Sequence, residues 1–185
     1  MMWYTHAIFG LFLYGILGLL GAPVNEETLA MAVLGALMPD IDHPKSYIST
    51  KLPFGNVVPR FVEHRGATHT IEAALLITAV VGGIAYYLTH NPWTVVAFFL
   101  GYVSHLLADS LTVSGVKWSR FSKFHPRGPV KTGTWKEGVV LVLVTFFTVA
   151  ILLYETGTES DVGEIVVVAL AITLALVGKR LKRLL

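Results

Sequence analysis

Histidine and aspartate residues form four short clusters, each at a point where an apolar segment meets a polar one. Imidazole and carboxylate groups bind divalent metal ions, and ionisable groups at membrane depth usually pair, bind an ion or take part in chemistry. The chain has no cysteine, so a metal site would use nitrogen and oxygen ligands, which favours zinc, manganese, iron or magnesium. The clusters lie at residues 5–7, 39–44, 64–70 and 104–110.

The fourth cluster is the most specific, because His105 and Asp109 are four residues apart and share one face of a helix. Small residues on the same stripe would let neighbouring helices approach closely. The alternative is a buried histidine–aspartate pair that only stabilises the bundle. The stripe comprises Ala97, Gly101, Ser104, His105, Ala108, Asp109 and Thr112, whereas Val96, Phe99, Tyr102, Val103, Leu106 and Leu107 form the bulky opposite surface.

The second cluster contains Asp40, Asp42 and His43, which offer several oxygen and nitrogen ligands within four residues. Both aspartates are candidate metal ligands, and the spacing does not separate them. His43 is a further candidate that the pattern leaves open. The alternative is an ordinary turn after a helix, in which the aspartates pair with nearby lysines.

The third cluster places His64 and His69 on either side of a glycine, and both are candidate metal ligands. Arg65 lies between them and is suited to stabilise a phosphate oxyanion. Thr68 is a candidate N-cap for the next helix. Glu72 follows one turn deeper and could orient a ligand or act as a general base.

The first cluster has a single histidine, and two further histidines lie outside the four clusters. His6 begins the first apolar segment, and its expected depth matches the other ligands, so it is a further metal candidate. We expect His90, in a turn on the opposite side, and His125, in a basic loop, to be exposed at the surface.

The elements that carry these residues are apolar runs, since 54% of the chain is hydrophobic and only 14% is charged. A helix needs about 20 apolar residues to cross a bilayer. We therefore expect an all-α integral membrane protein: a single domain over residues 1–185 with a bundle of about six transmembrane helices, the second one short. The runs are 3–21, 26–38, 70–88, 92–112, 138–154 and 162–178.

The basic residues indicate the orientation of the bundle. All 14 Lys and Arg residues fall in the segments 40–67 and 113–137 and in the C-terminal tail, whereas the opposite turns carry acidic residues. By the positive-inside rule, both termini are expected in the cytoplasm, with the metal site at the cytoplasmic end of the first four helices. The first run lacks a basic leader and carries His6, which favours a helix over a signal peptide.

Together these motifs resemble the YdjM-like membrane-bound metal-dependent hydrolases over about residues 1–135, while the helices over 138–185 look generic. The matching pieces are 5–6, 37–44, 64–70 and 101–112. That family is similar, at greater distance, to zinc-dependent phospholipases C and S1/P1-type nucleases, which hold a zinc cluster with a His-x-x-x-Asp pair. By analogy the resemblance implies phosphoester hydrolysis, although those relatives are soluble enzymes.

The sequence therefore predicts a metal-dependent hydrolase of the inner or plasma membrane that uses metal-activated water to cleave a phosphoester of a lipid or another membrane-accessible substrate. We expect one to three divalent ions, zinc foremost, and membrane lipids as partners. The basic loop 113–137 could hold a phosphate headgroup, and no nucleic acid is expected. The oligomeric state is open. The expected metal ligands are His6, Asp40, Asp42, His64, His69, His105 and Asp109, with Arg65 and Glu72 in catalytic roles.

Two other functions fit the same residues. A metal or proton transporter also places ionisable groups inside a membrane bundle, although transporter sites usually lie near the midplane between related halves. A non-catalytic membrane scaffold would use the histidine–aspartate pairs for stability alone. Membrane proteases fit poorly, because the chain has no His-Glu-x-x-His or Gly-x-Ser-x-Gly motif.

Overall fold

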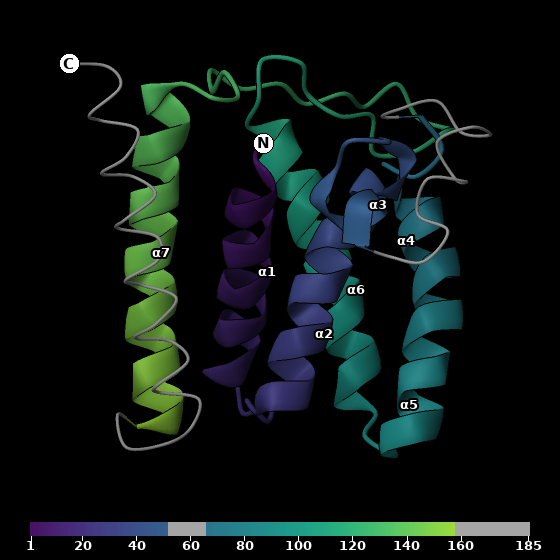
Figure 1. Cartoon of the computed structure of the whole chain (residues 1–185), viewed down its shortest axis with the longest axis vertical. Helices are drawn as coiled ribbons and strands as arrows, with labels where there is room; N and C mark the ends of the chain where they lie inside the picture. Colours follow the sequence, from purple (N-terminus) through teal and green to yellow (C-terminus); the bar gives the residue numbers. More distant parts are fainter. Residues whose placement is uncertain (52–65, 158–185) are drawn as a thin grey trace.

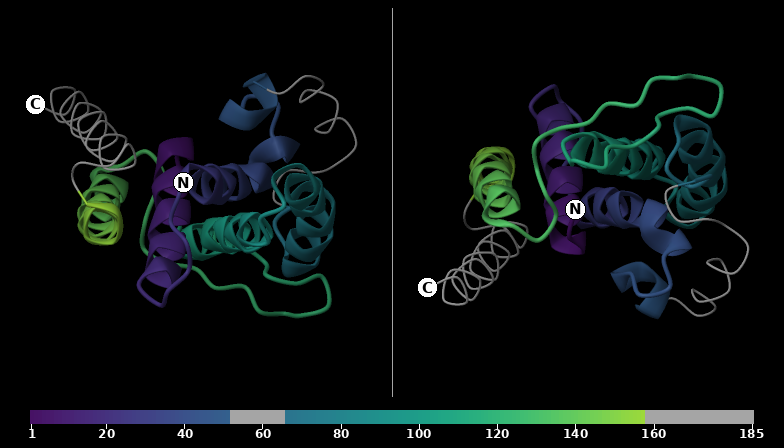
Figure 2. Two further views of the ribbon diagram at one scale, coloured as in Figure 1. Left: turned by 90° about the horizontal axis from the view of Figure 1, so that it is seen from below. Right: turned by 90° about the horizontal axis from the view of Figure 1, so that it is seen from above.

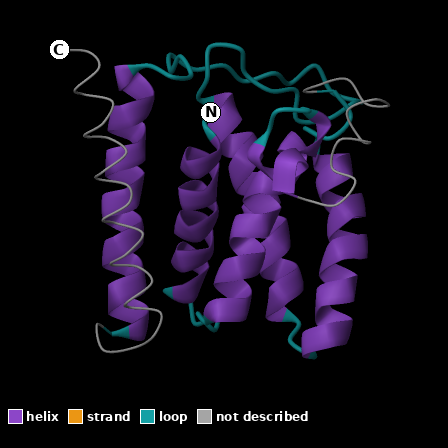
Figure 3. Cartoon of the chain, viewed as in Figure 1, coloured by secondary structure: helices purple, strands orange, loops and turns teal. Residues whose placement is uncertain are grey.

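The computed structural model describes residues 1–51 and 66–157, and this part of the chain is helical and contains no β-strand (Figure 3). An all-α fold is therefore confirmed. The elements in chain order are α1 (Trp3–Gly18), α2 (Glu26–Leu37), the 3-10 helix η1 (Met38–Asp42), α3 (Tyr47–Lys51), α4 (Ile71–Ile77), the π-helix η3 (Thr78–Gly82), α5 (Gly83–Thr89), α6 (Trp93–Ser110) and α7 (Trp135–Thr156).

The long helices run alternately in opposite directions (Figure 1). As a result the N-terminus, η1, α3, the start of α4, the end of α6 and the start of α7 all lie at one end of the bundle, which we call the site end. The end-on views place α2 and α6 beside one another at the centre, with α4 and α5 on one side and α1 followed by α7 on the other (Figure 2). This alternation brings the described histidines and aspartates of the four clusters to one end of the bundle, as the sequence predicted.

Within residues 1–51 and 66–157, three helices are long and apolar enough to cross a membrane: Ile71–Thr89, Trp93–Ser110 and Trp135–Thr156. They correspond to the third, fourth and fifth predicted runs. The first of them is α4, η3 and α5 in continuous succession. The first two predicted runs form α1 and α2, with 16 and 12 residues, and the sixth, 162–178, lies outside the described residues.

Helices α2 and α6 approach so closely that glycine is required at two contact points. A methyl group on Gly35 would collide with the carbonyl oxygen of Phe98, and one on Gly101 would collide with the carbonyl oxygen of Ala32. Such backbone contact is typical of small residues at helix interfaces in membranes. It holds the two central helices in a fixed register at the level of the site.

The small stripe predicted on α6 is buried along its whole length, from Ala97 to Thr112. On the bulky surface opposite, Tyr102 and Leu106 are also fully buried. Tyr102 packs in a cluster with Met38 and Ala74. Helix α6 therefore packs against other helices on further faces besides the small stripe.

Helix α7 is attached to the bundle through α1 and through Glu137, a fully buried carboxylate in its first turn. Glu137 accepts hydrogen bonds from the backbone amides of Met2 (2.6 Å) and Gly133 (2.6 Å) and from the Thr5 hydroxyl (3.0 Å). Because Thr5 precedes His6, these bonds also fix the start of α1 at the site end.

Candidate metal centre

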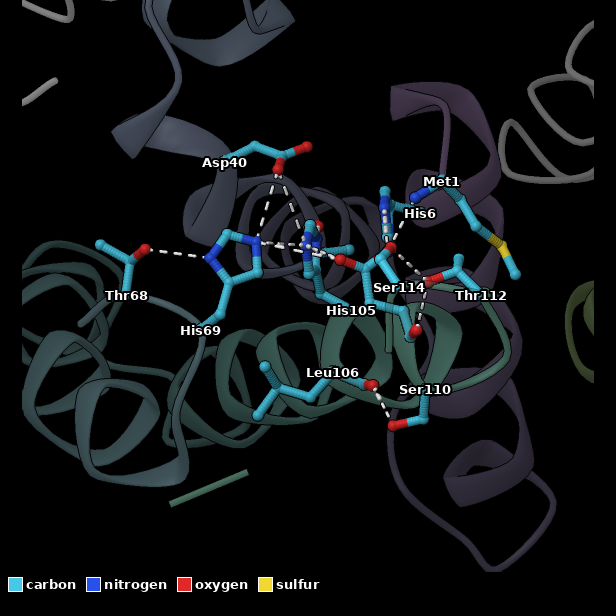
Figure 4. Close-up of polar contacts among 12 residues, drawn as sticks. Met1, His6, Asp40, Thr68, His69, His105, Leu106, Ser110, Thr112 and Ser114 are labelled. Atoms are coloured by element: carbon cyan, nitrogen blue, oxygen red, sulfur yellow. Dashed lines mark hydrogen bonds and ion pairs between the residues drawn. The ribbon is translucent and has the colours of Figure 1, made fainter. Parts of the chain in front are cut away.

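Five of the predicted ligands meet at the site end, and they come from four separate segments (Figure 4). Helix α1 contributes His6, η1 contributes Asp40, the segment before α4 contributes His69, and α6 contributes His105 and Asp109. Their donor atoms form two groups in which all atoms lie within 4.8 Å of one another. The groups are His6, His105 and Asp109, and Asp40, His69 and His105.

Four donor atoms lie at spacings close to those of a coordination shell. The two Nε2 atoms of His69 and His105 are 3.2 Å apart. Asp40 Oδ1 lies 3.6 Å from His69 Nε2 and 3.8 Å from His105 Nε2. Asp109 Oδ2 lies 4.0 and 3.8 Å from the same two nitrogens. Around tetrahedral zinc, with bonds of about 2.0–2.1 Å, neighbouring donors are about 3.3–3.4 Å apart, slightly closer than most of these histidine–aspartate separations.

The His105 ring is oriented by the backbone of α2. Its Nδ1 lies 2.7 Å from the carbonyl oxygen of Ala36. Because a carbonyl only accepts hydrogen bonds, this nitrogen carries the proton, and the neutral ring presents the Nε2 lone pair to the cluster. The close approach of α2 and α6 thus sets both the position and the tautomer of His105.

The His69 ring is held from behind by Asp42, whose Oδ2 lies 3.2 Å from His69 Nδ1. The Thr68 hydroxyl donates to the same Asp42 oxygen at 2.5 Å, and the Tyr102 hydroxyl donates to the Thr68 carbonyl at 2.6 Å. A carboxylate on the far nitrogen of a metal-binding histidine is a recurrent arrangement. The structure therefore separates the two aspartates: Asp40 faces the cluster, and Asp42 lies behind His69.

The donor set fits a divalent cation. The Nε2 atoms of His69 and His105 each lie within 4.0 Å of an oxygen of Asp40 and of Asp109, so nitrogen and oxygen ligand atoms are close together. These atoms repel one another unless a proton or a metal ion lies between them. Two histidines and two carboxylates suit zinc, manganese or iron better than calcium.

His6 lies on the other side of His105, with the two rings stacked at 3.7 Å between centroids. Its Nε2 is 3.5 Å from Asp109 Oδ1, which also accepts a 2.7 Å bond from the Met1 amino group. Its Nδ1 is buried and has no hydrogen-bond partner among the described residues. His6 therefore retains a nitrogen that a ligand could satisfy.

Asp40 and His69 lie outside the spanning helices, and the charged groups around them shift the pKa of each. Burial would raise the pKa of Asp40, but His105 and His69 hold it well below its usual range. Burial would lower the pKa of His69, but the carboxylates of Asp40 and Asp42 raise it to about 9. At neutral pH the metal-free cluster therefore keeps a proton on His69, which a cation would displace.

Access to the cluster is from the side of Asp40. The His69 and His105 side chains are fully buried, and those of His6 and Asp109 are exposed by 1% and 2%. The Asp40 side chain is 20% exposed. Water or a substrate oxygen would therefore reach the donor atoms past η1.

Other predicted residues lie elsewhere or outside the described part. His64 and Arg65 fall in the segment 52–65, which the structure does not describe. Glu72 accepts a hydrogen bond from the Ser119 hydroxyl at 2.5 Å and belongs to neither donor group. His43 Nδ1 accepts from the Lys45 amide at 3.2 Å. As predicted, His90 and His125 are exposed.

Sequence reasoning misplaced Thr68 and missed two groups that orient the histidines. Thr70, not Thr68, caps α4 by accepting from the Ala73 amide, which frees Thr68 for Asp42. The Ala36 carbonyl left no signal in the sequence, because every residue has one. The Tyr102 hydroxyl gave a weak signal, as a polar group in an apolar helix needs a partner.

Comparisons with known proteins identify relatives of the chain. The inner membrane protein YdjM of Escherichia coli (strain K12) is 38% identical over 91 residues, which cover 46% of this chain and 44% of that protein. The Shigella flexneri YdjM matches to the same extent. The uncharacterized protein YvsG of Bacillus subtilis (strain 168) is 34% identical over 121 residues, or 63% of this chain and 72% of YvsG.

The chain thus spans less than half the length of the two YdjM proteins. No solved structure matches the chain significantly. A model of the YdjM inner membrane protein family matches residues 1–182. Together with the apolar spanning helices, this match over nearly the whole sequence shows that the chain is a membrane protein and belongs to the YdjM family.

Proposed function

We propose that this chain is a membrane-embedded, metal-dependent hydrolase that cleaves a phosphoester of a lipid or of another membrane-accessible substrate. The observation that supports it most is that the Nε2 atoms of His69 and His105, 3.2 Å apart, both lie within 4.0 Å of an oxygen of Asp40 and of Asp109. Nothing in helix packing alone requires two histidines and two carboxylates to face one point.

Asp40, His69, His105 and Asp109 would hold the ion, with His6 as a further ligand. Zinc is the first candidate, followed by manganese, iron and magnesium. A divalent ion there would polarise a phosphoryl oxygen and lower the pKa of a water molecule. The two donor groups share His105, whose Nδ1 is used by Ala36. Since its Nε2 can bind one ion at a time, the described residues favour a single ion.

The remaining residues would orient the ligands, keep bulk water out and bind the substrate. Asp42 fixes the His69 ring, and the closely packed helices keep bulk water from all members except Asp40. Arg65 would stabilise charge on the phosphoryl group; it lies outside the described residues and stays a prediction. Glu72 is occupied by Ser119, so its proposed catalytic role has no supporting contact to the cluster.

The position of the site favours hydrolysis over transport. His6 lies in the first turn of α1, and Asp109 in the last turn of α6, so the cluster is at one end of the bundle. Transporter sites usually lie near the membrane midplane. The distribution of Lys and Arg supports a cytoplasmic location for this end, where an anionic leaflet would supply phosphoester substrates.

The test is a hydrolysis assay on the purified full chain in vesicles that contain phosphatidylglycerol, with zinc, manganese, iron or magnesium added in turn. We expect release of phosphorylated headgroup, and a loss of about a hundredfold or more in His105→Ala and Asp109→Asn, since the ion would be lost with its ligands. Glu27→Gln is the matched control, because Glu27 pairs with Asn91 at the opposite end.

A wild-type protein that binds metal but cleaves neither phospholipids nor a soluble phosphodiester would overturn the hydrolase proposal. Metal uptake into sealed vesicles that requires Asp109 would instead support transport. If chelator changes neither activity nor stability, and His105→Ala lowers only the melting temperature, the cluster is structural.

A further inference from the structure

The segment between α6 and α7 does not connect the two helices by the shortest path. It runs across the site end toward α4, turns, and comes back toward α7 (Figures 1 and 2). The outgoing and returning parts are hydrogen-bonded to each other, from the Val113 amide to the Val130 carbonyl at 3.0 Å and from the Trp118 amide to the Phe124 carbonyl at 3.4 Å. Residues 117–124 therefore form the far end of this loop, which we call the loop tip.

The loop tip is fixed to the start of α4. The Ile71 amide donates to the Trp118 carbonyl at 2.8 Å, and the Ser119 hydroxyl donates to Glu72. The Trp118 indole donates to the Ser110 hydroxyl at 2.8 Å. These bonds connect the loop tip to both α4 and α6, so its position relative to the bundle is defined.

The loop tip exposes two large apolar side chains, because Phe121 is 90% and Phe124 is 59% accessible. Two exposed phenylalanines three residues apart in one loop favour contact with an apolar environment. Around them stand three exposed cations, Lys117, Arg120 and Lys123. Aromatic rings beside lysine and arginine are typical of segments that rest on a membrane surface.

The whole loop is cationic. Between residues 113 and 136 there is no aspartate or glutamate. The only carboxylate that contacts the loop tip in the described part of the chain is Glu72, through Ser119. The basic residues in this stretch are Lys117, Arg120, Lys123, Arg127, Lys131 and Lys136.

The helix beside the loop tip indicates that the bilayer extends to the level of the loop tip. The spanning helix Ile71–Thr89 begins where the loop tip is attached. One turn further along, Leu75 and Leu76 are 58% and 69% exposed, as expected of residues that face lipid. The apolar outer face of this helix therefore starts beside the loop tip, which puts Phe121 and Phe124 near the headgroups.

We propose that the loop tip is a membrane-surface anchor: Phe121 and Phe124 enter the boundary between headgroups and acyl chains, and Lys117, Arg120 and Lys123 bind the phosphates of anionic lipids. This inference is independent of the metal centre and of hydrolysis. A nucleic acid would also attract the cations and could stack on the rings, but the attachment beside a lipid-facing helix favours the bilayer.

The test uses the absence of cysteine from the chain. Phe121→Cys in the full-length protein gives a single site for an aromatic fluorophore that replaces the ring. Leu76→Cys serves as a lipid-exposed reference, and Thr132→Cys, exposed on the returning part of the same loop, as a water-exposed one. Each labelled protein is placed in vesicles of phosphatidylcholine with phosphatidylglycerol, or of phosphatidylcholine alone.

We expect the label at position 121 to be quenched by nitroxide-bearing lipids and shielded from aqueous iodide, unlike the label at 132. The lipid contact should weaken in vesicles without phosphatidylglycerol. It should weaken also when Lys117, Arg120 or Lys123 is changed to glutamine, by about fivefold in the contact equilibrium per cation removed. The unchanged behaviour of a label at 76 shows that each variant remains inserted.

A label at 121 that iodide quenches as strongly as the label at 132, without quenching by the lipids, would overturn the proposal. Equal lipid quenching at 121 and 132 would also contradict it, since the anchor would not be the loop tip. A label that stays in water on vesicles but is shielded by added RNA or DNA would assign the loop tip to a nucleic acid instead.

Discussion

His69 lies between two carboxylates that have different relations to the donor cluster. Asp42 faces its Nδ1 at 3.2 Å, and Asp40 faces its Nε2 at 3.6 Å. A carboxylate that coordinates an ion supplies part of the binding energy directly, whereas one behind the ring acts through orientation and basicity. The two aspartates, so similar in sequence, should therefore differ in function.

Exchanging each aspartate for asparagine tests this difference. Asp40→Asn should lose the ion, because a coordinating carboxylate is removed from an almost fully buried site. Asp42→Asn should still bind one ion per chain at saturating metal, with an affinity lower by about 10–100-fold. Titration of the metal-free protein with zinc measures both. The interpretation is contradicted if Asp42→Asn abolishes binding while Asp40→Asn leaves it intact.

The proton on His69 predicts how metal binding responds to pH. Burial lowers the pKa of this ring, but Asp40 and Asp42 raise it to about 9, and His105 and Asp109 also face it. Below pH 9 an ion must displace the proton, so the apparent zinc affinity should rise by about tenfold per pH unit and level off above it. Calorimetry in buffers of different ionisation enthalpy would show the released proton. Affinity that does not change between neutral pH and 9 would exclude a protonated His69.

At this scale the sequence was sufficient to find histidines and aspartates that converge at one end of the bundle, but not their orientation. Asp40 and Asp42 could not be separated, because their directions depend on the 3-10 geometry of η1, which ordinary turn formers do not reveal. Thr68 was assigned to the wrong hydrogen bond, since a threonine before a helix can cap it or reach another segment.

At the level of the elements, the contact of α2 with α6 decides where His105 points. Gly35 and Gly101 allow the backbones to touch, and Ala36, next to Gly35, accepts the His105 hydrogen bond. Because the obstructing atoms are backbone carbonyls, no change of side-chain rotamer can make room for a larger residue. The two glycines are therefore part of the support of the site.

Gly101→Ala should destabilise the protein by about 1–3 kcal/mol or more through overpacking, and should weaken metal binding by lengthening the bond from His105 to Ala36. Thermal unfolding in detergent and zinc titration measure the two effects. Gly83→Ala is the matched control, because a methyl group there meets no atom within 4 Å and alanine favours a helix by up to about 1 kcal/mol. Equal stability of the two variants would contradict the close packing of α2 and α6.

The helices themselves were largely predictable, because length and apolarity define spans. The runs 70–88, 92–112 and 138–154 correspond to the three spanning helices. The burial of Tyr102 and Leu106 was not predictable from α6 alone, since it depends on which helices pack around it. Nor does the pattern of α7 show that it contacts the bundle mainly through α1.

For the whole molecule, the distribution of charge predicts an orientation in the membrane. All Lys and Arg residues occur in segments assigned to one side, and the described ones lie at the site end rather than at the turns before α2 and before α6. If the positive-inside rule holds, the site end faces the cytoplasm.

Single cysteines again provide the test. In intact cells Thr132→Cys should resist a membrane-impermeant maleimide until the membrane is permeabilised, whereas His90→Cys, exposed in the turn between α5 and α6, should react at once. Both sites are exposed in the protein, so burial does not distinguish them. The reverse pattern would place the metal centre outside the cytoplasm.

The central claim is that the cluster at the site end holds a metal ion, and the most direct test is to count metals per chain in purified protein. Wild type and Asp109→Ala are compared by elemental analysis after loading with zinc and removal of the excess. Asp109 lies 3.8 Å from His105 and 4.0 Å from His69 through one carboxylate oxygen, and 3.5 Å from His6 through the other. We predict about one ion per chain in the wild type, since the two donor groups share His105, and its loss in the variant. Protein that carries no zinc, manganese or iron in either form would contradict the metal centre.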